Sequence, residues 1–233
     1  EKGRFVRSNS FNVQMLKDDG HSIACISTVS MYNITTIGET CEYLEQNIEL
    51  TSGWNMISLN VNPIDETLFD IISPIHDQML LVIDETGLAI FPNPDQTWAD
   101  NIGQWFNTEG YLLKIEGDQS LNIQSEGVIT LPLAIPMTSG WNIISFPIQN
   151  SNGQNISDVF FDLVQVGSLF KVINEGGQVY VPESGLNSIG VMYPGEGYYV
   201  NVYEDASLTI NEINNVSVVN EINSYPNRTG HFE

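Results

Sequence analysis

"TSGWNMIS" at residues 51–58 and "TSGWNIIS" at residues 138–145 are almost the same eight residues written twice. A near-copy of this kind indicates a duplicated structural unit, whereas a catalytic site usually occurs once in a chain. The likeness continues, because "NIGQWFNTEGYLLKI" from Asn101 corresponds to "SIGVMYPGEGYYVNV" from Ser188. "LVIDETGLAIFP" and "FKVINEGGQVYVP" correspond after short insertions of the kind that loops accommodate. The sequence therefore predicts two tandem copies of one unit.

Within each copy the pattern indicates strands, hairpins and one short helix. "GWNMISLNV" and "GWNIISFPI" alternate in the manner of half-buried strands, and we expect Trp54 and Trp141 to anchor the core. Apolar spacings of three and four in "DETLFDIISPI" and "SDVFFDLV" predict a helix capped by Asp65 or Ser157. "DETG" and "NEGG" between β-rich runs predict hairpins with a glycine at positive φ. A second hairpin should follow Tyr111 and Tyr198, which we also place in the core.

The predicted fold class is mainly β with one short helix per unit, in two homologous barrel-like or sandwich-like repeats. We divide the chain into an N-terminal segment (1–48), a first unit (49–124), a linker strand (125–136), a second unit (137–211) and a C-terminal strand with a polar tail (212–233). About 75 residues is marginal for an isolated core, so the two units should pack together. A β-like run in the linker and another in the tail raise the alternative that a strand passes from one unit to another.

Charge excludes several classes of partner. Seven Lys and Arg stand against 29 Asp and Glu, a formal charge of −22 at pH 7. Such a surface repels nucleic-acid phosphates and anionic membranes. We therefore expect no nucleic-acid partner and no membrane insertion. The start of the chain has no apolar signal-peptide core and no initiating Met, which we interpret as a piece of a longer protein.

The two cysteines, Cys25 and Cys41, stand close together near the start of the chain. A bridge between them would close a small loop and add about 3 kcal/mol by restricting the unfolded chain. Two free buried thiols are the alternative. The three histidines lie far apart in sequence, so a zinc site has little support, and we expect no metal ligands.

The order of a Gly-Trp-Asn strand, a hairpin ending in Pro, an Ile-Gly turn and a Gly-Tyr strand resembles a repeat of large secreted surface proteins of marine bacteria that use the type IX route. The residues that carry the resemblance, which spans residues 50–210, are Gly53-Trp54-Asn55, Gly87, Pro92, Ile102-Gly103 and Gly110-Tyr111, with their second-copy partners. "ACISTVSMYNITTIGETCEY" resembles a shortened copy of a Cys-containing module in such proteins, but lacks its paired Asp. The resemblance implies an extracellular, non-catalytic spacer or interaction module.

Motifs of catalysis do not accumulate in this chain. It contains no "GxSxG" elbow and no phosphate-binding "GxxxxGK[ST]". Acidic positions recur in both copies, as with Glu85 and Glu175 or Glu109 and Glu196, which indicates turns, caps and solvated faces rather than a glycosidase pair. The acidic loops "LKDDGHS" and "NPDQTWADN" leave a structural calcium ion as the one cofactor to consider. We expect no enzyme activity.

Four aromatic residues are candidates for a glycan-binding platform, namely Trp98, Trp105, Tyr193 and Tyr199. Packing in the core or in loops is the competing interpretation of each. The first functional hypothesis is a secreted, cell-surface structural or adhesive module, whose partners are other domains or copies of the same protein. The alternatives are a carbohydrate-binding module that uses these aromatic residues and a filament subunit that assembles by strand donation.

Overall fold

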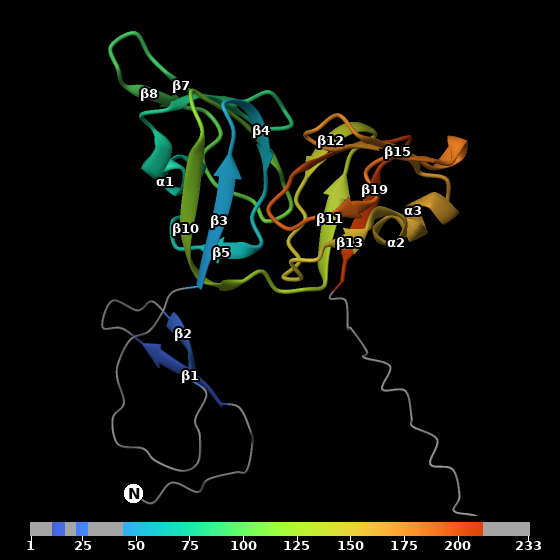
Figure 1. Ribbon diagram of the computed structural model, residues 1–233, viewed down its shortest axis with the longest axis horizontal. Helices are drawn as coiled ribbons and strands as arrows, with labels where there is room; N and C mark the ends of the chain where they lie inside the picture. The colour runs from blue at the N-terminus through green and yellow to red at the C-terminus, as the bar shows by residue number, and fades with distance from the viewer. Residues whose placement is uncertain (1–10, 17–21, 28–43, 212–233) are drawn as a thin grey trace, which may run out of the picture.

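The computed structural model describes residues 11–16, 22–27 and 44–211 (Figure 1). The protein is mostly β, with several antiparallel sheets and a few short helices. For clarity we call residues 44–128 the first half and residues 133–210 the second half. Each half has its own apolar core, and the halves lie side by side with β4 (Gly53–Ile57) and β12 (Gly140–Ile144) near their junction (Figure 1).

The first half packs two antiparallel sheets against one core. The larger sheet has the order β4-β9-β6-β7-β8 and the smaller has the order β3-β10-β5. A short helical segment follows β5. The elements besides β4 are β3 (Leu44–Leu50), β5 (Val61–Pro63), α1 (Leu68–Ile71), η1 (Ser73–Ile75), β6 (Met79–Ile83), β7 (Ala89–Pro92), β8 (Trp98–Asp100), β9 (Tyr111–Ile115) and β10 (Gln119–Val128).

The second half also combines antiparallel strands with short helices. Its five-stranded sheet has the order β12-β18-β14-β15-β16, and β11 pairs with β19 and β13 with β17. The elements besides β12 are β11 (Leu133–Met137), β13 (Gln154–Asn155), α2 (Ile156–Val159), α3 (Phe161–Gln165), β14 (Leu169–Ile173), β15 (Val179–Val181), η2 (Pro182–Ser184), β16 (Leu186–Asn187), β17 (Val191–Met192), β18 (Tyr198–Val202) and β19 (Ala206–Ile210).

The N-terminal segment contributes one described hairpin, β1 (Phe11–Leu16) paired with β2 (Ser22–Ser27). Cys25 lies in β2, but its side chain and the whole of Cys41 lie outside the described residues. The predicted disulfide therefore stays a prediction. The predicted C-terminal strand and tail, residues 212–233, also lie outside the described residues.

The predicted linker strand, residues 125–136, does not pair with strands of the opposite half. β10 continues through Val128 and pairs with β3 and β5 of its own half. β11 begins at Leu133 and pairs with β19. Each run of the linker thus closes the half to which it belongs.

The start of each duplicated stretch is a tight turn closed by an asparagine. Gly53 and Gly140 have φ values of 109° and 103°, which only glycine adopts without strain. The Asn55 side chain bonds both the N–H and the C=O of Thr51 at 2.8 Å. Asn142 does the same to Thr138 at 2.9 Å. The Gly and Asn of the duplicated stretch are therefore explained by this turn.

The prediction that Trp54 and Trp141 anchor the core is wrong. They are 44% and 48% exposed, because the buried Asn55 and Asn142 occupy the inward side of the strand and alternation turns each preceding tryptophan outward. Across the sheet Trp54 lies opposite Lys114, whose Nζ is 5.4 Å from the centre of the Trp54 ring. The core anchors at the junction are Tyr111 and Tyr198, both completely buried, as predicted.

The helix and hairpin predictions fare differently. Short helices occur where expected, but the N-caps are Thr67 and Asn155 rather than Asp65 and Ser157, since the side-chain oxygens of the former accept the first free N–H groups. The hairpin glycines are confirmed, with φ of 88° at Gly87 and 73° at Gly177. In the described part of the chain, no helix has the length and apolar character to cross a membrane.

Candidate functional site

The junction between the halves is built from two reciprocal sets of backbone hydrogen bonds. The segment that leads into β18 covers the free edge of β4: Ser58 N–H donates to Gly195 O and Gly197 N–H donates to Met56 O, both at 2.9 Å. The mirrored bonds join the segment before β9 to β12, where Ser145 N–H donates to Thr108 O at 3.2 Å. Each half therefore covers the edge strand of the other. An uncovered edge strand could pair with a strand of another molecule and cause aggregation.

The serine that ends each duplicated stretch belongs to this junction. The Ser58 hydroxyl donates to Glu196 O at 2.7 Å, and the Ser145 hydroxyl donates to Asn107 O. Both serines are completely buried. A buried hydroxyl needs a partner, and here the partner is always in the other half. The serine that ends the duplicated stretch is thus explained by contact between the halves.

A glutamate at the tip of each hairpin reaches across the junction as well. Met56 N–H donates to Glu175 Oε2 at 2.7 Å, and Ile143 N–H donates to Glu85 Oε2 at 3.1 Å. These bonds satisfy edge-strand N–H groups with a charged acceptor, which is stronger than a neutral one. Sequence reasoning noticed that Glu85 and Glu175 recur but assigned them to turns and solvated faces; the recurrence was the available signal for this contact.

A second pair of glutamates is bonded to the two buried tyrosines. The Tyr111 hydroxyl donates to Glu109 Oε2 at 3.0 Å and accepts from Phe106 N–H at 3.2 Å. Tyr198 repeats the arrangement with Glu196 and Tyr193 N–H. Burial raises the pKa of Glu109 and of Glu196 above the ordinary value, against the lowering effect of the tyrosine bond. Burial also raises the pKa of both tyrosine hydroxyls, so they stay protonated donors.

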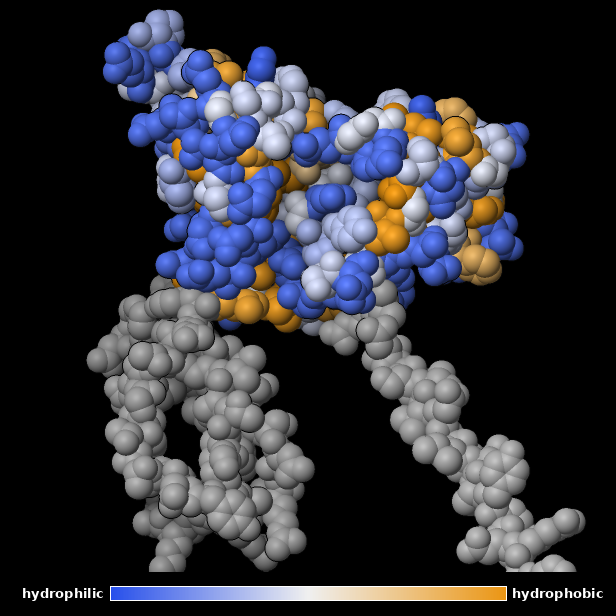
Figure 2. Space-filling model, in the orientation of Figure 1, coloured by the Kyte–Doolittle hydropathy of each residue, from blue (hydrophilic) through white to orange (hydrophobic). Residues whose placement is uncertain are grey.

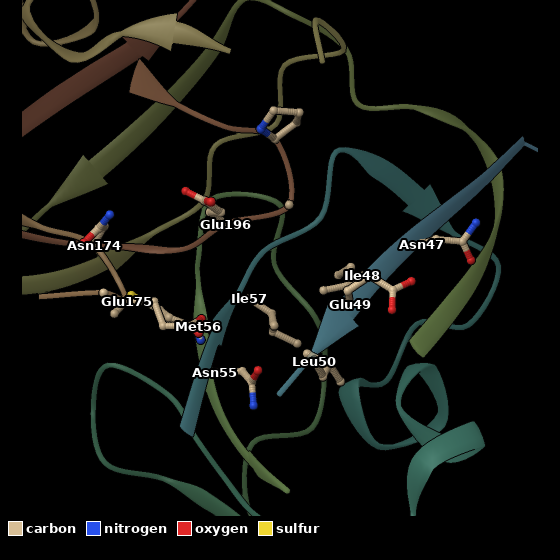
Figure 3. Close-up of a pocket in the computed structure, with 13 residues that line it drawn as sticks. Asn47, Ile48, Glu49, Leu50, Asn55, Met56, Ile57, Asn174, Glu175 and Glu196 are labelled. Carbon is tan, nitrogen blue, oxygen red and sulfur yellow. Dashed lines mark hydrogen bonds between the residues drawn. The ribbon is translucent and has the colours of Figure 1, made fainter. Parts of the chain in front are cut away.

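A groove of about 360 Å³ opens beside the hydrogen bond between Met56 and Glu175 (Figure 3). Strand β3 forms one wall, and β4 together with the tip of the β14–β15 hairpin forms the other. Its volume falls in the range of small ligand sites. Its polar lining side chains are Asn47, Glu49, Asn55, Asn174, Glu175 and Glu196. The groove therefore presents carboxylates and amides and no basic side chain.

The four aromatic candidates do not form one platform. Trp105 is only 8% exposed and belongs to the core of the first half, where its ring lies 4.7 Å from that of Tyr111. It is therefore not available to a glycan, which corrects its assignment. Trp98 is half-buried in a cluster with Phe69 and His76, whose ring centres lie 5.9 Å and 5.4 Å from its own.

The other two candidates belong to the second half. Tyr193 is 44% exposed. Tyr199 is partly buried and meets the edge of Trp141 with ring centres 6.0 Å apart. The exposed member of that pair is Trp141, a residue that sequence reasoning placed in the core. Trp141 and Tyr199 thus form one aromatic pair on this half, and Phe170 and Tyr203 form another, with ring centres 5.4 Å apart.

Residues 44–211 contain no candidate metal site, because no three His, Cys, Asp or Glu side chains in this range lie close enough together to hold an ion. Calcium binding by the acidic N-terminal loop, around Asp18 and Asp19, concerns residues outside the described ranges.

No family model, no curated protein and no solved structure matches the chain. The likeness to bacterial surface-protein repeats stays an expectation from the sequence.

Proposed function

We propose that this chain is a tandem pair of copies of one β-rich unit and serves as a rigid, non-catalytic structural or adhesive module of an extracellular surface protein or fibre. The observation that carries the proposal is the reciprocal capping of β4 and β12 across the junction. Corresponding positions in the two halves make matching backbone contacts to the opposite half. That pattern is what a duplicated unit needs when one copy alone is too small for a stable core.

The non-catalytic part of the proposal draws on how the polar groups of the junction are used. Each tyrosine hydroxyl both accepts a backbone N–H and donates to its glutamate. Glu85 and Glu175 each accept a hydrogen bond from a backbone N–H of the opposite half. Groups that hold the fold in duplicate are structural groups. The extracellular placement is supported by the strongly acidic composition and by the resemblance of the repeated motifs.

Single-molecule force spectroscopy of the full chain, pulled from its ends, tests the rigid-module proposal. Residues 44–211 should unfold in one event with a gain in contour length of roughly 550–600 Å, at about 3.3–3.6 Å per residue. Glu85→Ala combined with Glu175→Ala should lower the force at which this single event occurs, because two hydrogen bonds across the junction are lost. Two independent events in the unaltered chain would overturn the proposal of one mechanical unit.

The extracellular part has its own test. Antibodies against the folded chain should label intact, unpermeabilised source cells. Labelling that requires permeabilisation would overturn this part and leave the mechanical result standing.

A glycan-binding role is the second candidate, favoured by the exposed Trp141 beside Tyr199 and by the half-buried Trp98. Flat aromatic rings of this kind offer apolar area and a polar edge to a ligand. Binding on a glycan array that is lost in Trp141→Ala or Trp98→Ala, with the melting temperature kept, would support this role. Binding that survives both substitutions would exclude these rings as the platform.

A further inference from the structure

Among the described strands none pairs with the outer edge of β3, and this edge faces the groove. β10 lies between β3 and β5, and Ile64 N–H of the β5 side donates to Gln124 O at 3.1 Å. Because backbone groups alternate sides along a strand, the odd-numbered residues of β10 bond β3, and they pair there with Gln46, Ile48 and Leu50. The backbone groups of Asn47 and Glu49 therefore point away from β10, toward the groove that their residues line (Figure 3).

This open edge lies in a negatively charged setting. Glu49 lines the groove on the side of β3, and Glu175 and Glu196 line it on the side of the second half. Residues 44–211 contain only two lysines and no arginine, and these lysines, Lys114 and Lys171, lie on inner strands of the five-stranded sheets. The outer surface of β3 and β10 is likewise hydrophilic (Figure 2). An occupant of the groove should therefore be an extended, basic peptide.

The chain carries such a peptide in its own sequence. Residues 2–7, "KGRFVR", hold three basic side chains and no acidic one, and four of the seven Lys and Arg of the whole protein lie within the first 17 residues. Six residues in extended form span about 20 Å, close to the length of a strand such as β3. The C-terminal tail is the other β-prone segment, but Glu212 and Glu221 give it the wrong charge for this groove.

We propose that residues 2–7 of this chain, from the same or a second molecule, add as a strand to the free edge of β3. Their backbone groups pair with those of Asn47 and Glu49, and their basic side chains meet the carboxylates of Glu49, Glu175 and Glu196. Strand addition draws its affinity from main-chain hydrogen bonds and its selectivity from the flanking side chains. Burial raises the pKa of Glu196, and a cationic side chain beside it would favour its charged form. This inference holds whether or not the chain is a surface module.

Residue-resolved amide exchange on the full chain tests the added strand. Asn47 and Glu49 N–H should be protected from exchange in the unaltered protein and exchange at least tenfold faster in Arg4→Glu/Arg7→Glu, whereas Ile48 N–H, bonded to β10, should not change. The matched control is Arg228→Glu, a charge reversal at the other end. Unprotected Asn47 and Glu49 amides in the unaltered chain would overturn the proposal, as would loss of their protection on deletion of residues 212–233 instead.

Zero-length carbodiimide cross-linking identifies the contact itself. Lys2 should form amide cross-links to Glu49 or Glu175, with Glu183, an exposed glutamate away from the groove, as the internal control. A yield of Lys2 cross-links to Glu183 as high as the yield to Glu49 or Glu175 would overturn the proposal. A mixture of light and isotopically heavy protein separates the sources: mixed-mass cross-links show donation between molecules, and same-mass cross-links alone show closure within one.

Discussion

Gly110 and Gly197 meet at the centre of the junction: a Cβ atom placed on Gly110 would lie 3.3 Å from the Cα of Gly197. The same atom would lie 2.9 Å from both Ile143 Cγ2 and Ile144 O. Each glycine directly precedes a strand of its own half, β9 or β18, and each donates its N–H to the edge strand of the opposite half. The Gly-Tyr pair in each copy is therefore explained by close approach of two backbones followed by a buried ring.

Gly110→Ala should destabilise the fold by about 2–3 kcal/mol, because the new methyl group meets a carbonyl oxygen that cannot move without breaking the capping of β12. The matched control is Gly176→Ala, where the nearest atom is the Asn174 side-chain oxygen at 3.6 Å. Its free energy of unfolding should stay within about 0.5 kcal/mol of the unaltered value. Chemical denaturation measures both, and equal losses in the two variants would contradict the close approach.

Tyr198→Ala should cost about 3–5 kcal/mol, since it empties a fully buried aromatic site. Trp141→Ala, which changes a larger but half-exposed side chain, should cost only about 1 kcal/mol. Tyr198→Phe separates the hydroxyl from the ring and should cost about 1–3 kcal/mol, because Tyr193 N–H and Glu196 lose their partner. Thermal melting of the three variants checks the order, and a larger loss for Trp141→Ala than for Tyr198→Ala would reverse the assignment of the core.

The strands, hairpins and short helices of this fold were predictable because they depend on local alternation and on turn residues. The face that each strand buries was not, because Trp54 and Asn55 compete for it. Size favours burying the tryptophan, but the asparagine must close the turn at Gly53 and bond Leu113 O across the strand pair. A small polar residue two positions after a positive-φ glycine was the sequence signal for the inward side.

The junction was predictable only in outline. Small units should pack together, and Glu85 and Glu175 recur, yet nothing in one copy reveals which atoms of the other copy it meets. The bond from Met56 N–H to Glu175 joins residues far apart in sequence. Such long-range contacts depend on the relative placement of the halves, which local patterns do not encode.

Asn142→Ala should lower the free energy of unfolding by about 2–3 kcal/mol, because the Thr138 N–H and C=O and the Gly140 C=O lose the partner that the buried Asn142 side chain gives them. Asn201→Ala is the matched control: Asn201 lies on β18 opposite Trp141, on the solvent-facing side, and its loss should change little. Denaturant titration decides between the two, and a harmless Asn142→Ala would show that Gly140 alone sets the turn.

Acidification should stabilise the junction through Glu109 and Glu196. Burial raises the pKa of both carboxyls in the folded state, so the folded protein binds these protons more tightly than the unfolded chain. Their contribution to stability is complete below the unfolded pKa, near 4.3, and is lost as the pH rises through the higher folded pKa.

The double variant Glu109→Gln/Glu196→Gln keeps an acceptor for each tyrosine and removes this loss. It should melt a few degrees higher than the unaltered protein at pH 7 and at the same temperature near pH 4. Glu183→Gln removes one negative charge from an exposed position and should leave the difference in melting temperature between the two pH values unchanged. A double variant that melts lower than the unaltered protein at pH 7 would mean that the charged carboxylates stabilise the junction.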